Sequence, residues 1–315
     1  MTSSSPRAGG ALLGLSMFVA GVAGTWASWR WFVDTATGQR LDEAAFEGSA
    51  IGRNTLWRGA EPVLDVVSVP FIVVVLGAVA LIALMRRRWF LALQVAVLVG
   101  GANLTTQVLK HVVLDRPTLA ADVGPAGNSL PSGHTTVAAS VAAALLLVVP
   151  RRARPMVAVL GAGYTAVTGV STMIGGWHRP SDVVAAIMVV LAWAGLTTVL
   201  TALGTPERTD AGTGSSGTTV VAALFVVTAA GSGLVAASAL RSTRDLLAES
   251  GSVTARDDLA TAYLGAGMGV VAATALTFAA ILVAHQVASG RAGSDTPRSR
   301  SRVPAGTHVP QRPPK

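Results

Sequence analysis

The chain has 315 residues, of which 51% are hydrophobic and only 13% are charged, and its net charge is +8. Ordinary soluble domains carry about 25% charged residues, so this composition excludes a soluble globular protein. There is no cysteine, which excludes disulfides, zinc–thiolate sites and thiol catalysis.

Eight stretches lack Asp, Glu, Lys and Arg and reach, or nearly reach, the roughly 20 residues that a helix needs to cross a bilayer. None shows the period-two alternation of a transmembrane barrel, so helices are predicted. The fold class is therefore all-α, a polytopic integral membrane helical bundle with a six-span core and two additional C-terminal spans. In chain order the predicted spans are 8–29, 66–85, 89–109, 135–150, 156–177, 183–201, 218–240 and 259–284.

Composition also suggests how the chain is divided. Residues 1–204 form the predicted six-span core, and a Gly/Thr/Ser-rich cytoplasmic linker follows at 205–217. Residues 218–285 form a two-span appendage, and 286–315 form a basic tail rich in Pro, Ser and Arg that is predicted to be disordered. The positive charge concentrates in loops and tail, which favours contact with anionic lipid headgroups over nucleic acid, and no nucleic-acid partner is predicted.

The basic residues predict the orientation. With the N-terminus inside, the cytoplasmic segments contain 14 basic and three acidic residues, and the opposite side contains ten basic and 13 acidic residues. Basic residues gather on the cytoplasmic side of membrane proteins. We therefore expect a multi-pass plasma-membrane protein with both termini cytoplasmic and an uncleaved first span.

A small set of polar residues lies on the predicted extracytoplasmic side. The only internal lysine, Lys110, is followed by Arg116 and then by a Pro-Ser-Gly-His sequence at 131–134. His178 follows 44 residues after His134, and Asp182 comes four residues later. Two predicted spans separate the histidines, so both should lie on the same face of the membrane.

These residue types suit phosphoryl transfer. The transition state spreads negative charge over phosphate oxygens, so cations and N–H donors must surround it. Lys110 and Arg116 supply charge, and Ser132 with the amides after it supplies donors at a helix start, where Gly133 permits close approach. His178 can attack phosphorus if Asp182 holds its other nitrogen, and His134 can protonate the leaving alkoxide and then activate water.

The loop 34–62 between the first two spans also contains many charged side chains. We expect them to form a solvated amphipathic surface. They are Asp42, Glu43, Glu47, Arg53 and Arg58.

The segment 110–182 resembles the type-2 phosphatidic acid phosphatase superfamily, which includes lipid phosphate phosphatases and vanadium haloperoxidases. Its blocks are Lys with a following Arg-Pro, then Pro-Ser-Gly-His, then Ser-Arg with a downstream His-x-x-x-Asp. The resemblance implies that His178 becomes phosphorylated, that Asp182 orients it and that His134 is the acid–base. It also implies that Lys110, Arg116, Ser132 and Gly133 bind phosphate, with no metal and no cofactor.

The chain departs from this pattern in two places. Five residues separate Lys110 from Arg116, where the family usually has six. Thr172 stands where the family has an arginine, which removes one cation from the phosphate site. Arg179, beside the nucleophile, is a candidate replacement that binds substrate; the alternative is that it pairs with Asp182 or with a lipid headgroup.

The leading hypothesis is an integral membrane phosphatase that hydrolyses a lipid phosphate or diphosphate at the extracytoplasmic face through a phosphohistidine. Candidate substrates are a polyprenyl diphosphate, phosphatidic acid and phosphatidylglycerophosphate. A phosphotransferase with the same intermediate and a catalytically weakened lipid-phosphate-binding protein are the alternatives. The predicted partners are the lipid substrate and the bilayer, and the sequence does not predict an oligomeric state.

Overall fold

The computed structural model describes residues 6–66, 77, 89–121, 123, 129–204 and 216–289. Across these ranges the chain is a helical bundle without any strand. Six of the helices described there are long and apolar enough to cross a membrane, and one shorter apolar helix accompanies them. The prediction of a polytopic helical membrane protein is confirmed. The predicted span 66–85 lies almost wholly outside the described residues.

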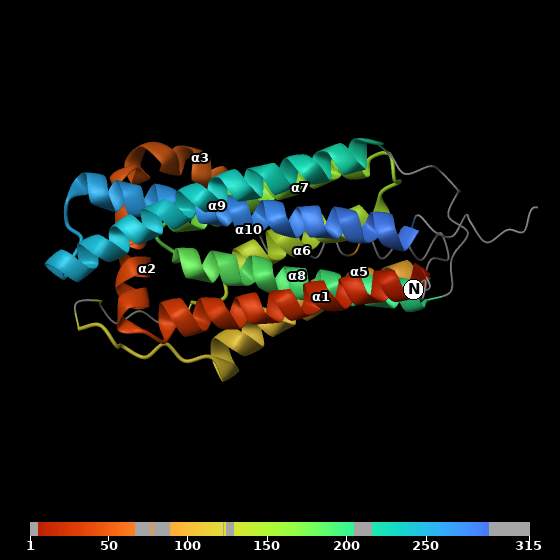
Figure 1. Ribbon diagram of the computed structural model, residues 1–315, viewed down its shortest axis with the longest axis horizontal. Helices are drawn as coiled ribbons and strands as arrows, with labels where there is room; N and C mark the ends of the chain where they lie inside the picture. Colours follow the sequence, from red (N-terminus) through yellow and green to blue (C-terminus); the bar gives the residue numbers. More distant parts are fainter. Residues whose placement is uncertain are drawn as a thin grey trace, which may run out of the picture.

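The longer helices run along the long axis of the molecule (Figure 1). They are α1 (Pro6–Ser28), α5 (Trp89–Val108), α6 (Gly133–Val148), α7 (Arg154–Ile174), α8 (Pro180–Leu203), α9 (Ser216–Ser250) and α10 (Arg256–Ser289). Two of them continue into π-helical turns, η1 (Trp29–Val33) after α1 and η3 (Leu109–Val113) after α5. Shorter elements lie at the left end of Figure 1: α2 (Ala36–Gly48), the 3₁₀ turn η2 (Ser49–Ile51) and α3 (Arg53–Val66). We call this end of the molecule the α2 end.

Local sequence signals start the helices that matter for the site. The side chain of Thr35 accepts a hydrogen bond from the Gly38 N–H and so caps α2. Ser132 caps α6 in the same way, by accepting from the Thr135 N–H at 3.4 Å. Pro180 is the first residue of α8, a position where its missing N–H costs nothing. Both α6 and α8 begin at the α2 end, which brings their first turns together.

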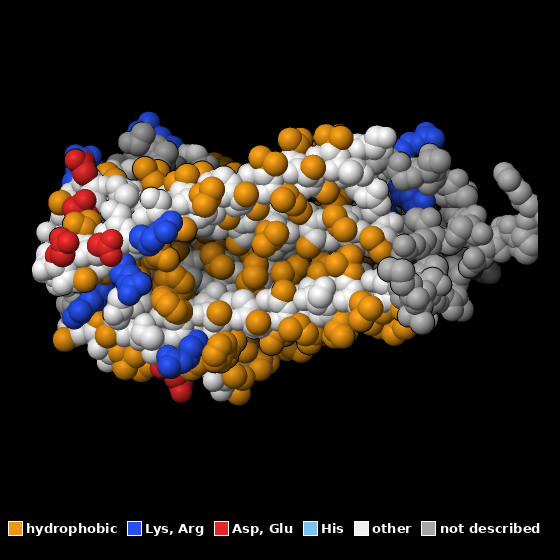
Figure 2. Space-filling view, viewed as in Figure 1, with side chains coloured by type: hydrophobic (Ala, Val, Ile, Leu, Met, Phe, Trp, Pro, Cys, Tyr) orange, Lys and Arg blue, Asp and Glu red, His pale blue; other side chains and the backbone are white. Residues whose placement is uncertain are grey.

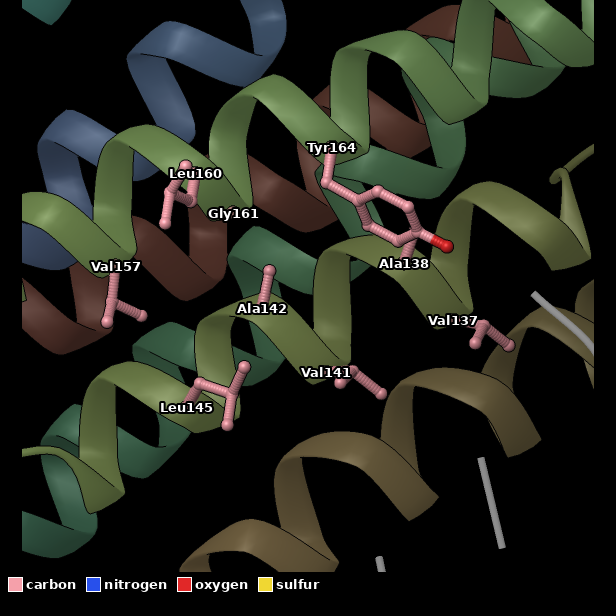
Figure 3. Close-up of a pocket in the computed structure, with 9 residues that line it drawn as sticks. All are labelled: Val137, Ala138, Val141, Ala142, Leu145, Val157, Leu160, Gly161 and Tyr164. Atoms are coloured by element: carbon pink, nitrogen blue, oxygen red, sulfur yellow. The ribbon is translucent and has the colours of Figure 1, made fainter. Parts of the chain in front are cut away.

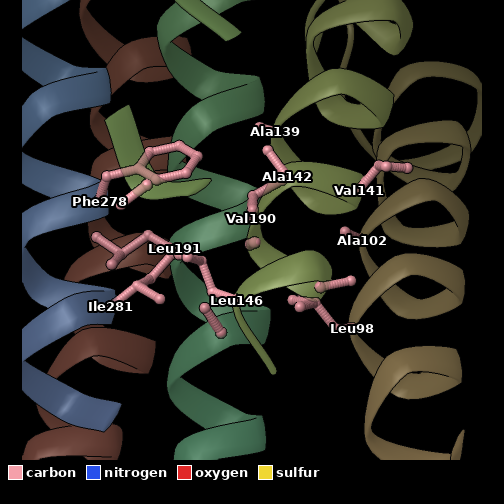
Figure 4. Packing of buried hydrophobic residues seen from close by; sticks show 14 of the residues in the cluster. Leu98, Ala102, Ala139, Val141, Ala142, Leu146, Val190, Leu191, Phe278 and Ile281 are labelled. Carbon is pink, nitrogen blue, oxygen red and sulfur yellow. The ribbon is translucent and has the colours of Figure 1, made fainter. Parts of the chain in front are cut away.

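The main core lies between α5, α6, α8 and α10 (Figure 4). Leu98, Leu146, Val190 and Phe278, one from each of these helices, are almost completely buried. Helix α10 also packs on α9, α2 and α7, so the last two helices are joined to the rest of the bundle by extensive contacts. The division into a core and an appendage remains a prediction, and most of the linker and tail lies outside the described residues.

Small residues permit close helix contacts, which is typical of membrane proteins. Helix α1 packs along α8 so closely that a Cβ atom on Gly14 would lie 2.6 Å from the carbonyl oxygen of Gly195. On the face shown in Figure 2, acidic side chains gather at the α2 end and hydrophobic side chains cover the middle. This middle band is the surface expected to face lipid.

Candidate active site

The turn between α7 and α8 positions His178. Gly176 adopts a φ of +70°, a conformation that glycine reaches without steric cost. The N–H groups of Trp177 and His178 then both donate to the carbonyl of Thr172, at 3.0 and 3.3 Å. The imidazole is thereby buried at the α2 end, with only 7% of the residue surface exposed.

Asp182 organises the surroundings of this imidazole. It is fully buried in the first turn of α8, and its Oδ2 lies 3.4 Å from Nδ1 of His178. The same oxygen accepts from the Ser129 hydroxyl at 2.6 Å and from the Arg179 N–H at 2.9 Å, and Oδ1 accepts from Nη2 of Arg116 at 3.2 Å. Since Nδ1 faces the carboxylate, Nε2 of His178 is the nitrogen suited to nucleophilic attack.

The start of α6 lies directly beside this dyad. The N–H of Ser132 donates to the backbone carbonyl of Asp182 at 2.9 Å, which fixes the two first turns against each other. A Cβ atom on Gly133 would meet only Nε2 of Gln107, at 3.9 Å, so the space in front of this backbone is open within the described parts of the chain. An anion can therefore approach the first amides of α6, and the helix dipole favours negative charge there.

His134 completes the arrangement. Its ring centre lies 6.3 Å from that of His178, with the planes at 63°, and 5.3 Å from the Trp177 ring. The two histidines, 44 residues apart in the sequence, thus lie close together in the structure. Their separation leaves room for a small group between the two imidazoles.

The two predicted cations approach from the segment after α5. Lys110 lies in the π-helical turn η3, a type of turn that often occurs at functional sites, and it interacts electrostatically with Asp182 and His134. The side chain of Arg116 is 7% exposed and forms an ion pair with Asp182. Residues Lys110, Arg116, Ser132, Gly133, His134, His178 and Asp182 are thus gathered at the α2 end.

Arg179 behaves differently from these residues. Its guanidinium donates twice to Oε2 of Glu43, from Nε at 2.9 Å and from Nη2 at 2.5 Å, and it lies 4.9 Å from the centre of the Phe46 ring. Its backbone contacts Asp182: the N–H donates to Oδ2 at 2.9 Å, and the carbonyl accepts from the Asp182 N–H at 3.1 Å. Thr172, at the family's arginine position, is buried, and its hydroxyl donates to the carbonyl of Gly169. In this structure neither side chain is directed as a phosphate ligand.

The expectation that the charged residues of 34–62 form a solvated surface is wrong for three of them. Asp42 is 2% exposed and bonds to Ser181 in α8. Glu43 binds Arg179, and Nε of Arg53 donates to the carbonyl of Ile174 at 2.8 Å, just before the glycine turn. Tertiary packing explains the difference, because α2 packs against α10 and α8 instead of lying on a free surface. Glu47 and Arg58 are exposed, as expected.

Two further groups were missed by the sequence analysis. Gln39 donates to the carbonyls of Val33 and Pro117 and accepts from the amides of Leu119 and Ala120, and so fixes the loop after Arg116. Ser129 binds Asp182 from the same loop. The available signal for α2 was the spacing of Gln39, Asp42 and Glu43, which places three polar side chains on one face of a helix.

An apolar groove of about 250 Å³ lies between α6 and α7 (Figure 3). From α6 it is lined by Val137, Ala138, Val141, Ala142 and Leu145, at helical spacing after His134. Tyr164 of α7 stands at one end of the groove, and its buried hydroxyl has no hydrogen-bond partner within the described part of the chain. The groove follows the helix that carries one of the two site histidines.

No three His, Asp or Glu side chains come close enough to hold a metal ion in the described ranges. A search of curated proteins and a search of solved structures each found no match. Residues 89–205 match the family model of the PAP2 superfamily. This range contains every motif residue gathered at the α2 end and excludes α2 itself. Residues 89–205 are thus similar to the PAP2 superfamily, which agrees with the family predicted from the motifs.

Proposed function

We propose that this membrane protein of the phosphatase type hydrolyses a lipid phosphate or diphosphate through a phosphohistidine. The observation that supports this most is the His178–Asp182 pair facing His134 across 6.3 Å, next to the open backbone of Gly133. A phosphate held by the first amides of α6, Lys110 and Arg116 would present its phosphorus to His178.

The proposed reaction has two balanced steps. In the first, Nε2 of His178 forms a bond to phosphorus while the bond from phosphorus to the lipid oxygen breaks, and His134 gives its proton to that oxygen. In the second, His134 takes a proton from water, the resulting hydroxide bonds to phosphorus, and the bond to nitrogen breaks. Inorganic phosphate leaves, and both histidines return to their starting states.

The proposed substrate class follows from the membrane and from the groove between α6 and α7. A lipid keeps its hydrocarbon chain in the bilayer while its phosphate reaches the site. The groove spans from Val137 to Leu145, roughly 12 Å of helix, and begins one turn below His134. We assign this groove to the hydrocarbon chain of the substrate; it orients the chain instead of adding much affinity, because lipid tails are already in an apolar medium.

The proposed location of the site is the extracytoplasmic face of the plasma membrane, with both termini in the cytoplasm. It is supported by the basic residues, since Arg151 and Arg152 lie between α6 and α7, at the end of the bundle opposite the site. Polyprenyl diphosphate, phosphatidic acid and phosphatidylglycerophosphate all suit such a site. A labelling experiment that finds an introduced cysteine at position 152 accessible from outside the cell would reverse this orientation.

Phosphate release by detergent-purified protein across these lipids is the decisive experiment, with His178→Ala as the control. We expect release by the wild type without any added acceptor, and loss of release in the variant by at least about 10³-fold. Release that needs an added acceptor alcohol would favour a phosphotransferase. Binding of lipid phosphate without turnover would favour a binding protein, and turnover that survives in His178→Ala would exclude the phosphohistidine mechanism.

Filling the groove tests the assignment of the lipid chain. Val141→Trp is expected to lower kcat/KM for a long-chain lipid phosphate by about tenfold and to leave hydrolysis of a short-chain, water-soluble phosphate ester nearly unchanged. Val159→Trp, on the exposed face of α7, is the matched control. Equal losses on long and short substrates would show that the groove does not hold the chain.

A further inference from the structure

Asp42 is a buried carboxylate that reaches the site from outside the family region, residues 89–205. Its Oδ1 accepts from the Ser181 N–H at 3.1 Å, and its Oδ2 accepts from the Ser181 hydroxyl at 2.5 Å. Ser181 is the second residue of α8, immediately before Asp182. Asp42 therefore fixes the helix turn that carries the orienting carboxylate of the dyad.

The same carboxylate also faces Arg116. Nη2 of Arg116 lies 3.2 Å from Oδ1 of Asp182 and 3.9 Å from Oδ2 of Asp42, so two acids flank one side of the guanidinium. Nε of Arg116 is buried and has no hydrogen-bond partner in the described ranges. Because a guanidinium binds phosphate through parallel N–H groups, its orientation decides whether these donors meet the substrate.

Among the residues that the structure describes, the other surroundings of Asp42 contain little charge. The charged groups that face it are Asp182 and Arg116. Asp42 also lines a cavity of about 140 Å³, whose other lining is mostly apolar side chains of η1, α2, α8, α9 and α10, with Ser28, Ser181 and Thr243. Burial first, and then the negative charge of Asp182, raise the pKa of Asp42 to about 7. The carboxyl group can thus change its charge near neutral pH.

We propose that Asp42 is a positioning residue for Arg116 that makes phosphate binding dependent on its own protonation. When Asp42 is ionised, Arg116 is shared between two carboxylates and part of its charge is neutralised. When Asp42 is protonated, Arg116 keeps one acidic partner, and its free donors and its charge serve the phosphate. The contact with Ser181 persists in both states, because a neutral carboxyl still accepts hydrogen bonds. This inference rests on the proposed phosphate site.

Linkage gives the direction of the effect. An arriving phosphate adds negative charge beside Asp42 and so favours its protonated form, and the protonated form must in turn favour phosphate by the same factor. Affinity for phosphate is therefore expected to fall as the pH rises through about 7. One added unit charge at this range in a partly buried site corresponds to about a tenfold change in affinity.

The test measures binding of inorganic phosphate to the detergent-purified full chain, through the increase in thermal stability with phosphate concentration. The wild type, Asp42→Asn and Asp34→Asn are compared at pH 6 and pH 8. Asp34 forms an exposed ion pair with Arg30 and serves as the matched control. The ionisation of phosphate and of the histidines is common to all three proteins, so the readout is the ratio of dissociation constants between variant and wild type at each pH.

We expect Asp42→Asn to match the wild type at pH 6 and to bind phosphate about tenfold more tightly than the wild type at pH 8. Asp34→Asn should match the wild type at both. Asp42→Ala also loses the contacts with Ser181, so it should bind phosphate weakly at both pH values. If Asp42 had only a structural role, Asp42→Asn would bind phosphate weakly as well. A ratio for Asp42→Asn that is the same at both pH values, or weaker binding throughout, would overturn the proposal.

Failure of the proposed function can be told apart from failure of this inference. Phosphate binding requires no turnover, so the expected pH-dependent ratio without any hydrolysis would support the role of Asp42 and refute the phosphatase. Hydrolysis together with a ratio of dissociation constants that is the same at pH 6 and pH 8 would support the phosphatase and refute the role of Asp42. Loss of phosphate binding in the wild type at both pH values would refute both.

Discussion

The turn before α8 and helix α2 both bring carboxylates to the same site, and they do so by different means. Asp182 lies four residues after His178, so the first turn of α8 alone brings the two side chains together. Asp42 lies 140 residues before Asp182 and reaches it only because α2 packs across the starts of α8 and α10. The first is a local arrangement within the family region, and the second is a tertiary contact made by a segment outside it.

This difference separates the range that matches the family model, residues 89–205, from a segment outside it. The local arrangement contains the groups that would contact phosphorus. The α2 contacts instead orient those groups: Asp42 through Ser181 and Arg116, and Glu43 through Arg179. Substitutions in the two regions should therefore differ in size and in kind.

Asp182→Asn should have the largest effect. The amide removes the charge that orients His178 and stabilises its positive form. Its NH2 group also opposes either the donor of Arg116 or the donors of Ser129 and Arg179, depending on which oxygen it replaces. We expect turnover to fall by about 10³- to 10⁴-fold, as for other carboxylate–histidine pairs. Asp257→Asn in the exposed first turn of α10 is the control. Turnover within tenfold of the wild type would mean that the dyad does not carry the reaction.

Arg179→Ala tests whether the residue next to His178 replaces the family arginine. If Arg179 exchanges Glu43 for phosphate during turnover, kcat should fall by about 10²-fold while KM for the lipid changes little. Glu43→Gln frees the guanidinium and should leave kcat nearly intact. Equal losses in both variants would show that the pair only anchors α2 to α8, which is the arrangement seen in the structure.

Gly176→Ala should lower activity by about tenfold or more. A Cβ atom there requires a strained positive φ and would lie 2.7 Å from Nη2 of Arg53, so the turn that positions His178 must shift. Gly251→Ala between α9 and α10 is the matched control, since its φ is +77° and nothing lies within 4 Å of its added Cβ. Both variants should lose about 1–2 kcal/mol of stability from backbone strain. Equal activities would show that the position of this turn is unimportant.

Besides its effect on phosphate binding, Asp42→Asn should change the stability of the protein by a small amount. The pKa of Asp42 in the folded protein, about 7, is above the ordinary value of 3.8, so the folded chain retains a proton that the unfolded chain has lost. The wild type therefore loses stability as the pH rises from about 4 to about 7, and Asn removes this loss. We expect the midpoint of thermal unfolding of the variant to rise by several degrees relative to the wild type between pH 5 and pH 8. A constant difference would show that Asp42 does not titrate in this range.

The sequence alone determined the features that depend on composition and short spacing. Apolar stretches predicted the long helices, and the Pro-Ser-Gly-His sequence with His178 and Asp182 predicted the paired imidazoles and the family. These signals are readable because a helix start and an i, i+4 pair are local, and because two intervening spans return the chain to the same side.

Only the tertiary structure decided the surroundings of the site. It showed that Asp42, Glu43, Gln39 and Arg53 act on α8, on the loop after Arg116 and on the glycine turn. In the sequence these side chains look like the polar face of a solvated helix. Polar residues on one face are equally compatible with contact to water and with contact to a polar partner, so the pattern cannot distinguish the two. The partner is more than 70 residues away in each case, and that distance is bridged only when the whole bundle has packed.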